Sequence, residues 1–172
     1  MSVDWALLYR TTYEDLVRFL YRKVWDADRA QDLAQETFVR CLRDGGARPI
    51  DNARAFVFTV AINLARDEAR TVVRRKKHLA LLANENAMES AVEAEETLER
   101  ERRVAAVEAA LSDLSERDRE ILLLWDAGLS YPEIAQHSGL AIGAIGTTLS
   151  RARRRLVETY EEIERQKHVA HR

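Results

Sequence analysis

The sequence predicts an all-α protein made of two small helical domains that are joined by a flexible acidic linker. The 172-residue chain holds only two prolines and six glycines, so few positions interrupt a long helix. Its apolar residues recur at helical spacing rather than alternating as in a strand. Its charge is divided by position. Residues 1–77 carry 15 Lys and Arg against 11 Asp and Glu, residues 78–100 carry one against six, and residues 101–172 carry 11 against 12. A basic block, an acidic connector and a second block indicate two modules and a linker.

Composition excludes several classes of protein. No apolar run approaches the roughly 18 residues of a membrane span. The start, MSVDWALLYR, lacks the charged and apolar blocks of a signal peptide. The single cysteine cannot form a disulfide framework or a metal site, and the four histidines are scattered along the chain. We therefore expect a cytoplasmic protein with no catalytic site, no metal and no cofactor.

The first module is predicted to begin with two helices, over residues 5–24 and 27–43. One face of the second helix gathers small and apolar side chains, and the opposite face is acidic. The residues of that acidic stripe recur at i, i+4, i+7 and i+8: Asp28, Asp32, Gln35 and Glu36. Such a stripe is either a solvated helix face or a docking surface for a basic partner helix. Periodicity alone does not separate the two.

A third helix is predicted over residues 54–77, after a loop with Gly-Gly and Arg-Pro breakers. Apolar side chains cover most of its circumference and leave one narrow polar strip. The strip holds Thr59, Asn63, Arg66, Arg70 and Arg74, and Lys77 continues it. Hydrogen-bonding groups that end in a row of cations suit a phosphate backbone with one or two base readers beside it. The alternative is an ordinary surface helix with a basic end, but the asparagine on the same strip favours nucleic acid.

Residues 78–100 are predicted to be the linker, because their glutamates repel one another and extend the chain. The second module is predicted over residues 101–165, with a tail over 166–172. It begins with a short helix over 102–114. The next helix follows Ser115, ends at Gly128 and is expected to bury Ile121, Leu122, Leu124 and Trp125.

A helix-turn-helix pattern follows in the second module. Ser130 and Glu133 form a predicted capping box with Pro132 in the first turn, and Gly139 turns the chain into the segment 141–156, AIGAIGTTLSRARRRL. The predicted core face of that segment holds Ile142, Ile145, Leu149, Ala152 and Leu156. Its opposite face holds Gly143, Ala144, Thr147, Ser150, Arg151 and Arg154, with Arg155 beside them. The second helix of such a motif enters the DNA major groove, although plain helical hairpins share the pattern.

Four stretches, in this order, resemble the bacterial sigma-70 family and specifically its small extracytoplasmic-function (ECF) sigma factors. They are DLAQETFVRC (32–41), ARAFVFTVAINLARDEAR (53–70), LSDLSERDREILLLWDAGLSYPEIAQHSGLAIG (111–143) and LSRARRRL (149–156). The resemblance implies a sigma2-like domain over 1–77 and a sigma4-like domain over 101–165. Together they would bind RNA polymerase core and direct it to promoters.

The resemblance also implies roles for the first module. The acidic stripe would dock on the clamp helices of the largest polymerase subunit. The loop 44–52 and the helix 54–77 would read the minus-ten element, where a base is flipped from the non-template strand into a pocket. The implied minus-ten residues are Phe56, Phe58, Asn63, Arg66, Arg70 and Arg74. The linker would thread towards the polymerase active-site cleft.

The second module would read the minus-thirty-five element while resting on the flap of the second-largest subunit. The implied residues are Ala144, Thr147, Thr148, Arg151, Arg153, Arg154 and Arg155. We expect the arginines to contact mainly phosphates, with Thr147 and Arg151 as base readers. The family usually has a capping Ser, a basic residue and an Arg where this sequence has Ala141, Gly146 and Thr148. This difference predicts a weaker or less discriminating contact.

The predicted function is therefore that of an ECF sigma factor that guides core polymerase to promoters and begins strand opening. Its predicted partners are the beta and beta-prime subunits, promoter DNA and an anti-sigma factor, with no small-molecule substrate. The alternative is a sigma-like decoy that binds an anti-sigma factor without promoter activity, a role suggested by the altered recognition helix.

Overall fold

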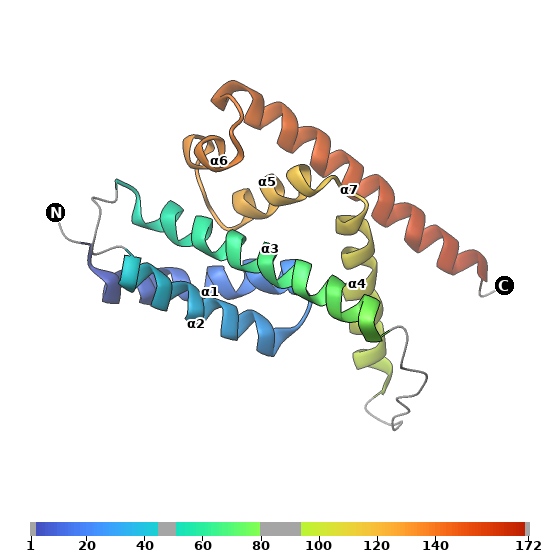
Figure 1. The fold of residues 1–172 in the computed structure, drawn as a ribbon. Coiled ribbons are helices and arrows are strands. Elements are labelled where there is room, and N and C mark those ends of the chain that lie inside the picture. Colours follow the sequence, from blue (N-terminus) through green and yellow to red (C-terminus); the bar gives the residue numbers. More distant parts are fainter. Residues whose placement is uncertain (1–2, 45–50, 80–93, 171–172) are drawn as a thin grey trace. The chain divides into compact units, whose positions relative to one another are not determined.

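A computed structural model of the chain describes residues 3–44, 51–79 and 94–170. These residues form seven helices and no strands (Figure 1). The helices are α1 (Trp5–Val24), α2 (Ala27–Asp44), α3 (Ala53–Leu79), α4 (Ala94–Ser112), α5 (Glu116–Asp126), α6 (Tyr131–Ser138) and α7 (Ile142–Ala170). The all-α prediction is confirmed. None of the helices in the described part of the chain combines the length and apolar character needed to span a bilayer.

The chain divides into two compact units, and α5 contributes to both. Unit 1 contains α1, α2 and α3 together with Leu123–Gly139, which includes the end of α5 and α6. Unit 2 contains α4, the start of α5 up to Leu122, and α7.

In unit 1, α1, α2 and α3 pack side by side around one apolar core (Figure 1). The Asp4 carboxylate caps α1 by accepting from the Leu7 N–H at 3.0 Å. The helix ends at Trp25, whose φ of 55° is left-handed and whose N–H donates to the Tyr21 carbonyl. The largest fully buried side chains of this core are Leu16, Leu20, Leu33, Val57, Phe58 and Ile62.

Cys41 lies in the same core. Its burial, together with the charge of Asp44, raises the pKa of its thiol to about 12. The thiol therefore stays protonated, which makes Cys41 a packing residue.

Arg54 connects α3 to the other segments of unit 1. Its guanidinium donates to the Asp15 carboxylate at 3.2 Å and to the backbone carbonyl of Ala127, and it lies 5.6 Å from the centre of the Phe58 ring. A cation in the first turn of a helix opposes the helix dipole. The contacts with Asp15 and Ala127 offset that cost.

The predicted capping box of α6 is present. The Glu133 carboxylate accepts from the Ser130 hydroxyl at 2.6 Å, Pro132 occupies the first turn, and Gly139 ends the helix with a φ of 72°. Local signals alone were enough to predict both ends of this helix.

In unit 2, α4 packs on α7. Their core, with residues from the start of α5, combines three alanines with four large aliphatic side chains: Ala106, Ala110, Leu111, Ile121, Ile145, Leu149 and Ala152. Alanines at 106, 110 and 152 allow the helix axes to approach closely, and the branched side chains fill the remaining space.

Several predicted boundaries and burials differ from the structure. α4 begins at Ala94 rather than 102, because AEETLERE contains strong helix formers and Glu99 pairs with Arg103 one turn later. Trp125 and Ile142 were predicted to be buried but are 39% and 54% exposed, since each lies at a helix end. Helix α7 continues beyond 156 to Ala170. Residues 80–93 of the predicted linker and 45–50 of the predicted minus-ten loop lie outside the described residues.

Candidate polymerase and nucleic-acid interfaces

The acidic stripe of α2 faces away from the core of unit 1. Asp28, Asp32 and Gln35 are exposed and Glu36 is half-buried. Two of the carboxylates have counterions on their own helix: Asp32 lies 3.7 Å from Arg29, and Glu36 accepts from Arg40 at 2.6 Å. The stripe therefore presents oxygen acceptors with part of its charge already balanced.

Two apolar residues continue the acidic stripe towards the end of α2. Val39 is 63% exposed and Leu42 is 55% exposed. With Asp28, Asp32 and Gln35 they are spaced 4, 3, 4 and 3 residues apart, which is the seam of a helix that pairs with a coiled coil. We call these five residues the α2 seam. Sequence reasoning stopped at Glu36 and missed its apolar half.

The α2 seam is held in place by an ion pair with α3. The Arg29 guanidinium donates to Glu68 through two bonds, Nε to Oε1 at 2.7 Å and Nη2 to Oε2 at 2.6 Å. This hydrogen-bonded pair, aided by the charges of Asp32 and Glu36 against a smaller cost of desolvation, raises the pKa of Arg29. A bidentate pair fixes the rotation of α2 against α3 and so fixes which face is exposed.

The predicted minus-ten residues of α3 separate into three groups. Asn63 and Arg70 are exposed, and Phe56 and Arg66 are half-buried, so all four are accessible. Phe58 is not: it is fully buried with its ring edge-on to Phe19 at 5.4 Å, so its role as a DNA-contacting aromatic is corrected to one in the core. The side chain of Arg74 lies outside the described residues.

Three of the accessible residues, Phe56, Asn63 and Arg66, line one hollow of unit 1. Its other lining residues are Asp51, Asn52, Ala55, Thr59, Glu133, Gln136 and His137. An aromatic ring, an amide and a guanidinium around one hollow can stack on a base, bond its edge and hold its phosphate. Periodicity predicts Asn63 and Arg66 on one polar strip, and the family resemblance adds Phe56; in the structure all three line the same hollow.

Asn52 ties the edge of that hollow together. Its Oδ1 caps α3 by accepting from the Ala55 N–H at 2.9 Å, and its Nδ2 donates to Glu133 Oε1 at 2.6 Å. Partial burial raises the pKa of Glu133, but the bonds from Ser130 and Asn52 and the charge of Arg54 outweigh it, so that the pKa is lowered overall. The carboxylate is thus held in its charged form.

On α7 the predicted minus-thirty-five residues are mostly exposed. Thr147, Arg151, Arg153, Arg154 and Arg155 are exposed and Ala144 is half-buried. Thr148 is buried at 7% exposure, so its predicted DNA contact is corrected to a packing role. It lies one turn from both Ile145 and Ala152 and therefore shares their core face.

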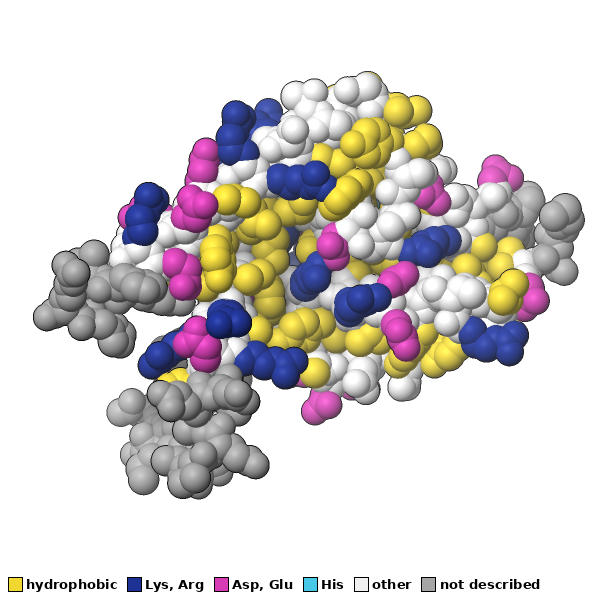
Figure 2. All heavy atoms as spheres, turned by 180° about the vertical axis from the view of Figure 1, so that it is seen from behind, with side chains coloured by type: hydrophobic (Ala, Val, Ile, Leu, Met, Phe, Trp, Pro, Cys, Tyr) yellow, Lys and Arg dark blue, Asp and Glu magenta, His cyan; other side chains and the backbone are white. Residues whose placement is uncertain are grey.

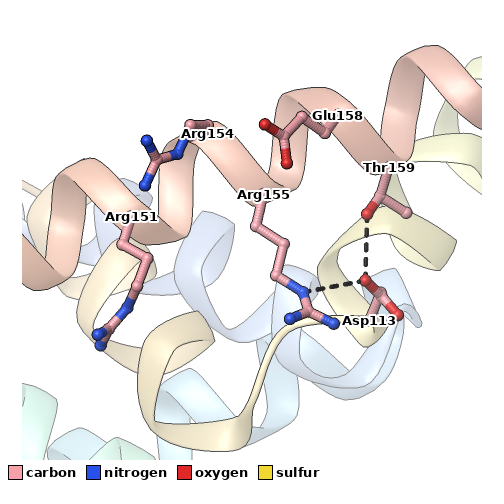
Figure 3. A pocket seen from close by; sticks show the side chains of 6 residues that line it. All are labelled: Asp113, Arg151, Arg154, Arg155, Glu158 and Thr159. Atoms are coloured by element: carbon pink, nitrogen blue, oxygen red, sulfur yellow. Dashed lines mark hydrogen bonds and ion pairs between the residues drawn. The ribbon is translucent and has the colours of Figure 1, made fainter.

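Two acidic side chains of unit 2 pair with arginines of α7. Arg151 lies 3.7 Å from Asp118, and Arg155 Nε donates to Asp113 Oδ2 at 3.2 Å (Figure 3). Thr159 donates to the same oxygen at 3.1 Å. Arg154 has no hydrogen bond or ion pair with any residue in the described part of the chain. Sequence reasoning missed Asp113 and Asp118, because they lie 42 and 33 residues before their partners.

These arginines, with three further side chains, line a shallow hollow on unit 2. The lining residues are Asp113, Arg151, Arg154, Arg155, Glu158 and Thr159. Figure 3 shows Arg155 and Thr159 reaching from α7 towards Asp113 on the facing segment. On the face shown in Figure 2, basic and acidic side chains of the described residues are interspersed. Three arginines and two carboxylates line the hollow, so its net charge is positive but small, which suits contact with a few phosphates.

Comparison with known families agrees with this geometry. Residues 8–75 match the model of sigma-70 region 2, and residues 105–156 match the model of sigma-70 region 4. A relative from Escherichia coli (strain K12), the ferric citrate uptake sigma factor FecI, is 31% identical over 154 residues, which are 88% of this chain and 87% of the relative. The chain belongs to the sigma-70 family, as an ECF sigma factor.

Two further comparisons support this family. The ECF sigma factor EcfG of Rhodopseudomonas palustris (strain TIE-1) is 34% identical over 138 residues, covering 76% of this chain and 71% of the relative. A solved structure, the sigma factor RpoE of Bartonella quintana in complex with the anti-sigma factor NepR, matches with a TM-score of 0.68. It is 25% identical, and the match covers 92% of this chain and 97% of that one.

Proposed function

We propose that this ECF sigma factor directs core RNA polymerase to specific promoters in the cytoplasm and begins strand opening, without catalytic chemistry of its own. The observation that carries the proposal is the pairing, in one chain, of a surface suited to a coiled coil with two surfaces suited to DNA. A decoy that only binds an anti-sigma factor would need neither the hollow at Asn63 nor the exposed arginines of α7.

The α2 seam is the proposed docking site for the polymerase clamp helices. Its acidic half attracts basic side chains, and Val39 and Leu42 offer apolar area that is otherwise left in water. The core of an interface is depleted in charged residues, and the end of the seam at Val39 and Leu42 carries none. This argument favours docking over the solvated alternative.

The hollow that contains Asn63 is the proposed site for a flipped base of the minus-ten element. The Asn63 amide can bond a base edge, Phe56 can stack on its plane, and Arg66 and Arg70 can hold the neighbouring phosphates. Extruding a base costs a few kcal/mol, so recognition in this hollow would supply part of the free energy of strand opening.

The exposed face of α7 is the proposed site for the minus-thirty-five element. Arg151, Arg153, Arg154 and Arg155 would contact phosphates, with Thr147 and Arg151 nearest the bases. The uncapped start at Ala141 and the glycines at 143 and 146 leave few long donors early in the helix. Binding here would consequently rest on charge more than on base readout.

An anti-sigma factor is the proposed regulator, because the solved RpoE of Bartonella quintana is held by one. The function is tested by run-off transcription with core polymerase, the purified chain and a pool of genomic promoters. We expect a small set of discrete transcripts that depend on the chain. Absence of promoter-dependent transcripts, combined with tight binding of an anti-sigma factor, would favour the decoy instead.

A further inference from the structure

Asp113 occupies a position where a carboxylate is not expected. It directly follows the last residue of α4, and its N–H bonds the Ala109 carbonyl at 3.1 Å. The negative end of the helix dipole disfavours an acidic side chain at such a position. Two donors from successive turns of α7, Arg155 Nε and the Thr159 hydroxyl, converge on its Oδ2 atom at 3.2 and 3.1 Å (Figure 3).

The geometry of the Arg155 bond determines what remains for a ligand. A guanidinium carries five N–H donors, and only the Nε–H is used by Asp113. The two terminal amino groups remain available at the hollow that Arg151 and Arg154 also line. An arginine side chain otherwise loses rotamer freedom when it is fixed on binding, so an arginine that is already held binds a phosphate at lower entropic cost.

We propose that Asp113 is a positioning residue for DNA binding, which holds Arg155 so that its terminal amino groups meet a backbone phosphate. Thr159 is the second support, because it fixes the carboxylate that fixes the arginine. The inference rests on the proposed DNA-binding role of α7. Asp113 and Thr159 would thus raise the affinity for DNA without touching the DNA themselves.

Glu158 provides a matched control on the same hollow. It is exposed, it lines the hollow, and among the described residues it has no hydrogen bond or ion pair with an arginine. Its removal takes away one negative charge near the phosphate without releasing Arg155. The Glu158→Ala variant should therefore bind DNA more tightly, whereas Asp113→Ala should bind it more weakly.

The test measures binding of the full chain to a fluorescent mixed-sequence DNA duplex over a series of salt concentrations. Asp113→Ala is expected to weaken binding about tenfold at low salt and to lower the slope of log K against log salt by about 1, and the same result is expected for Arg155→Ala. Asp113→Asn keeps an oxygen acceptor and should bind at least as tightly as wild type. Asp113→Ala should add nothing in the Arg155→Ala background, because both changes remove one contact.

The outcomes distinguish this inference from the proposed function. If Asp113→Ala binds as tightly as wild type or more tightly, while Arg154→Ala and Arg155→Ala bind weakly, Asp113 is only a competing counterion and the positioning role is wrong. If the wild type shows no salt-dependent duplex binding, or Arg154→Ala has no effect, the DNA-binding role of α7 itself is wrong. Thermal unfolding of each variant shows whether lost binding reflects lost folding. If Asp113→Asn binds DNA as weakly as Asp113→Ala, the proposal is also wrong.

Discussion

The two proposed DNA surfaces, on α3 and on α7, differ in how they hold their polar groups. On α3, one amide and one aromatic ring line a hollow whose edge is fixed by Asn52 bonding Glu133. On α7, arginines stand exposed on a helix and are steered by carboxylates at 3.2 and 3.7 Å. The arrangement on α3 suits recognition of a base by its shape and hydrogen-bonding groups, whereas the arrangement on α7 suits contact with the charged phosphates of the DNA backbone. We therefore expect α3 to carry most of the sequence specificity and α7 most of the salt-dependent affinity.

The largest expected effect is on α3. Asn63→Ala should lower promoter-dependent run-off transcription by about thirtyfold, because a lost base contact of this kind costs about 2 kcal/mol. Duplex binding by the free chain should be unchanged, since it depends on α7. Run-off transcription and duplex titration of the same preparation measure the two effects. An equal loss in the two assays would contradict the proposal that α3 provides specificity and α7 provides duplex affinity.

Arg154→Ala should have the next largest effect. Because Arg154 has no ion pair to break among the described residues, its loss should weaken duplex binding about tenfold on all sequences and lower the salt slope by about 1. Arg151→Ala should weaken binding on most sequences too, but less, since Asp118 already occupies part of that guanidinium. A loss confined to a single base pair would instead assign base readout to the arginine.

Gly143→Ala is expected to change the stability of the chain and its affinity for DNA in opposite directions. Apart from its chain neighbours and its own helix backbone, a methyl group at this position would meet no atom within 4 Å, and alanine favours a helix by about 1 kcal/mol over glycine. Thermal unfolding should show a more stable chain by up to that amount. Duplex affinity should fall slightly, because the added methyl group would hinder close approach of a phosphate to the start of α7. Unchanged or lower stability would mean that the start of α7 is not helical in solution.

The smallest effect concerns pH and Glu133. Because its pKa is lowered in the folded chain, its contribution to stability is present above the pKa of the unfolded chain and is lost as pH falls through the folded value. Glu133→Gln should destabilise the chain by less than about 1 kcal/mol at neutral pH, since the site is partly exposed. The difference in the free energy of unfolding between Glu133→Gln and wild type should shrink as the pH is lowered. A difference that persists at low pH would show that the charge of Glu133 plays no part.

Local signals predicted much of this fold. The periodicity of residues 5–24 and the capping box at Ser130 agree with α1 and α6, since both depend on neighbours within a few residues. The exposure of Val39 and Leu42 could also have been predicted, because their spacing continues that of Asp32 and Gln35. These features lie on single helices, where the sequence determines which side chains share a face.

Features that join distant segments could not be predicted in this way. Phe58 and Thr148 occupy plausible DNA-facing positions on the chain, and only packing against other helices shows that they are buried. The bond between Asp113 and Arg155 depends on how α4 meets α7, and no periodicity within either helix contains that information. The start of α4 was placed eight residues too late, because glutamates that repel in a tether also favour a helix when arginines follow one turn later.

In the proposed function, the α2 seam attaches this sigma factor to core polymerase. This attachment is tested by size-exclusion chromatography of the purified chain with core polymerase, in the absence of any anti-sigma factor. Wild type should co-elute with the polymerase, whereas Leu42→Asp, which alters an exposed side chain and should leave the fold intact, should elute alone. Failure of wild type to co-elute, or co-elution of Leu42→Asp at wild-type stoichiometry, would contradict the account.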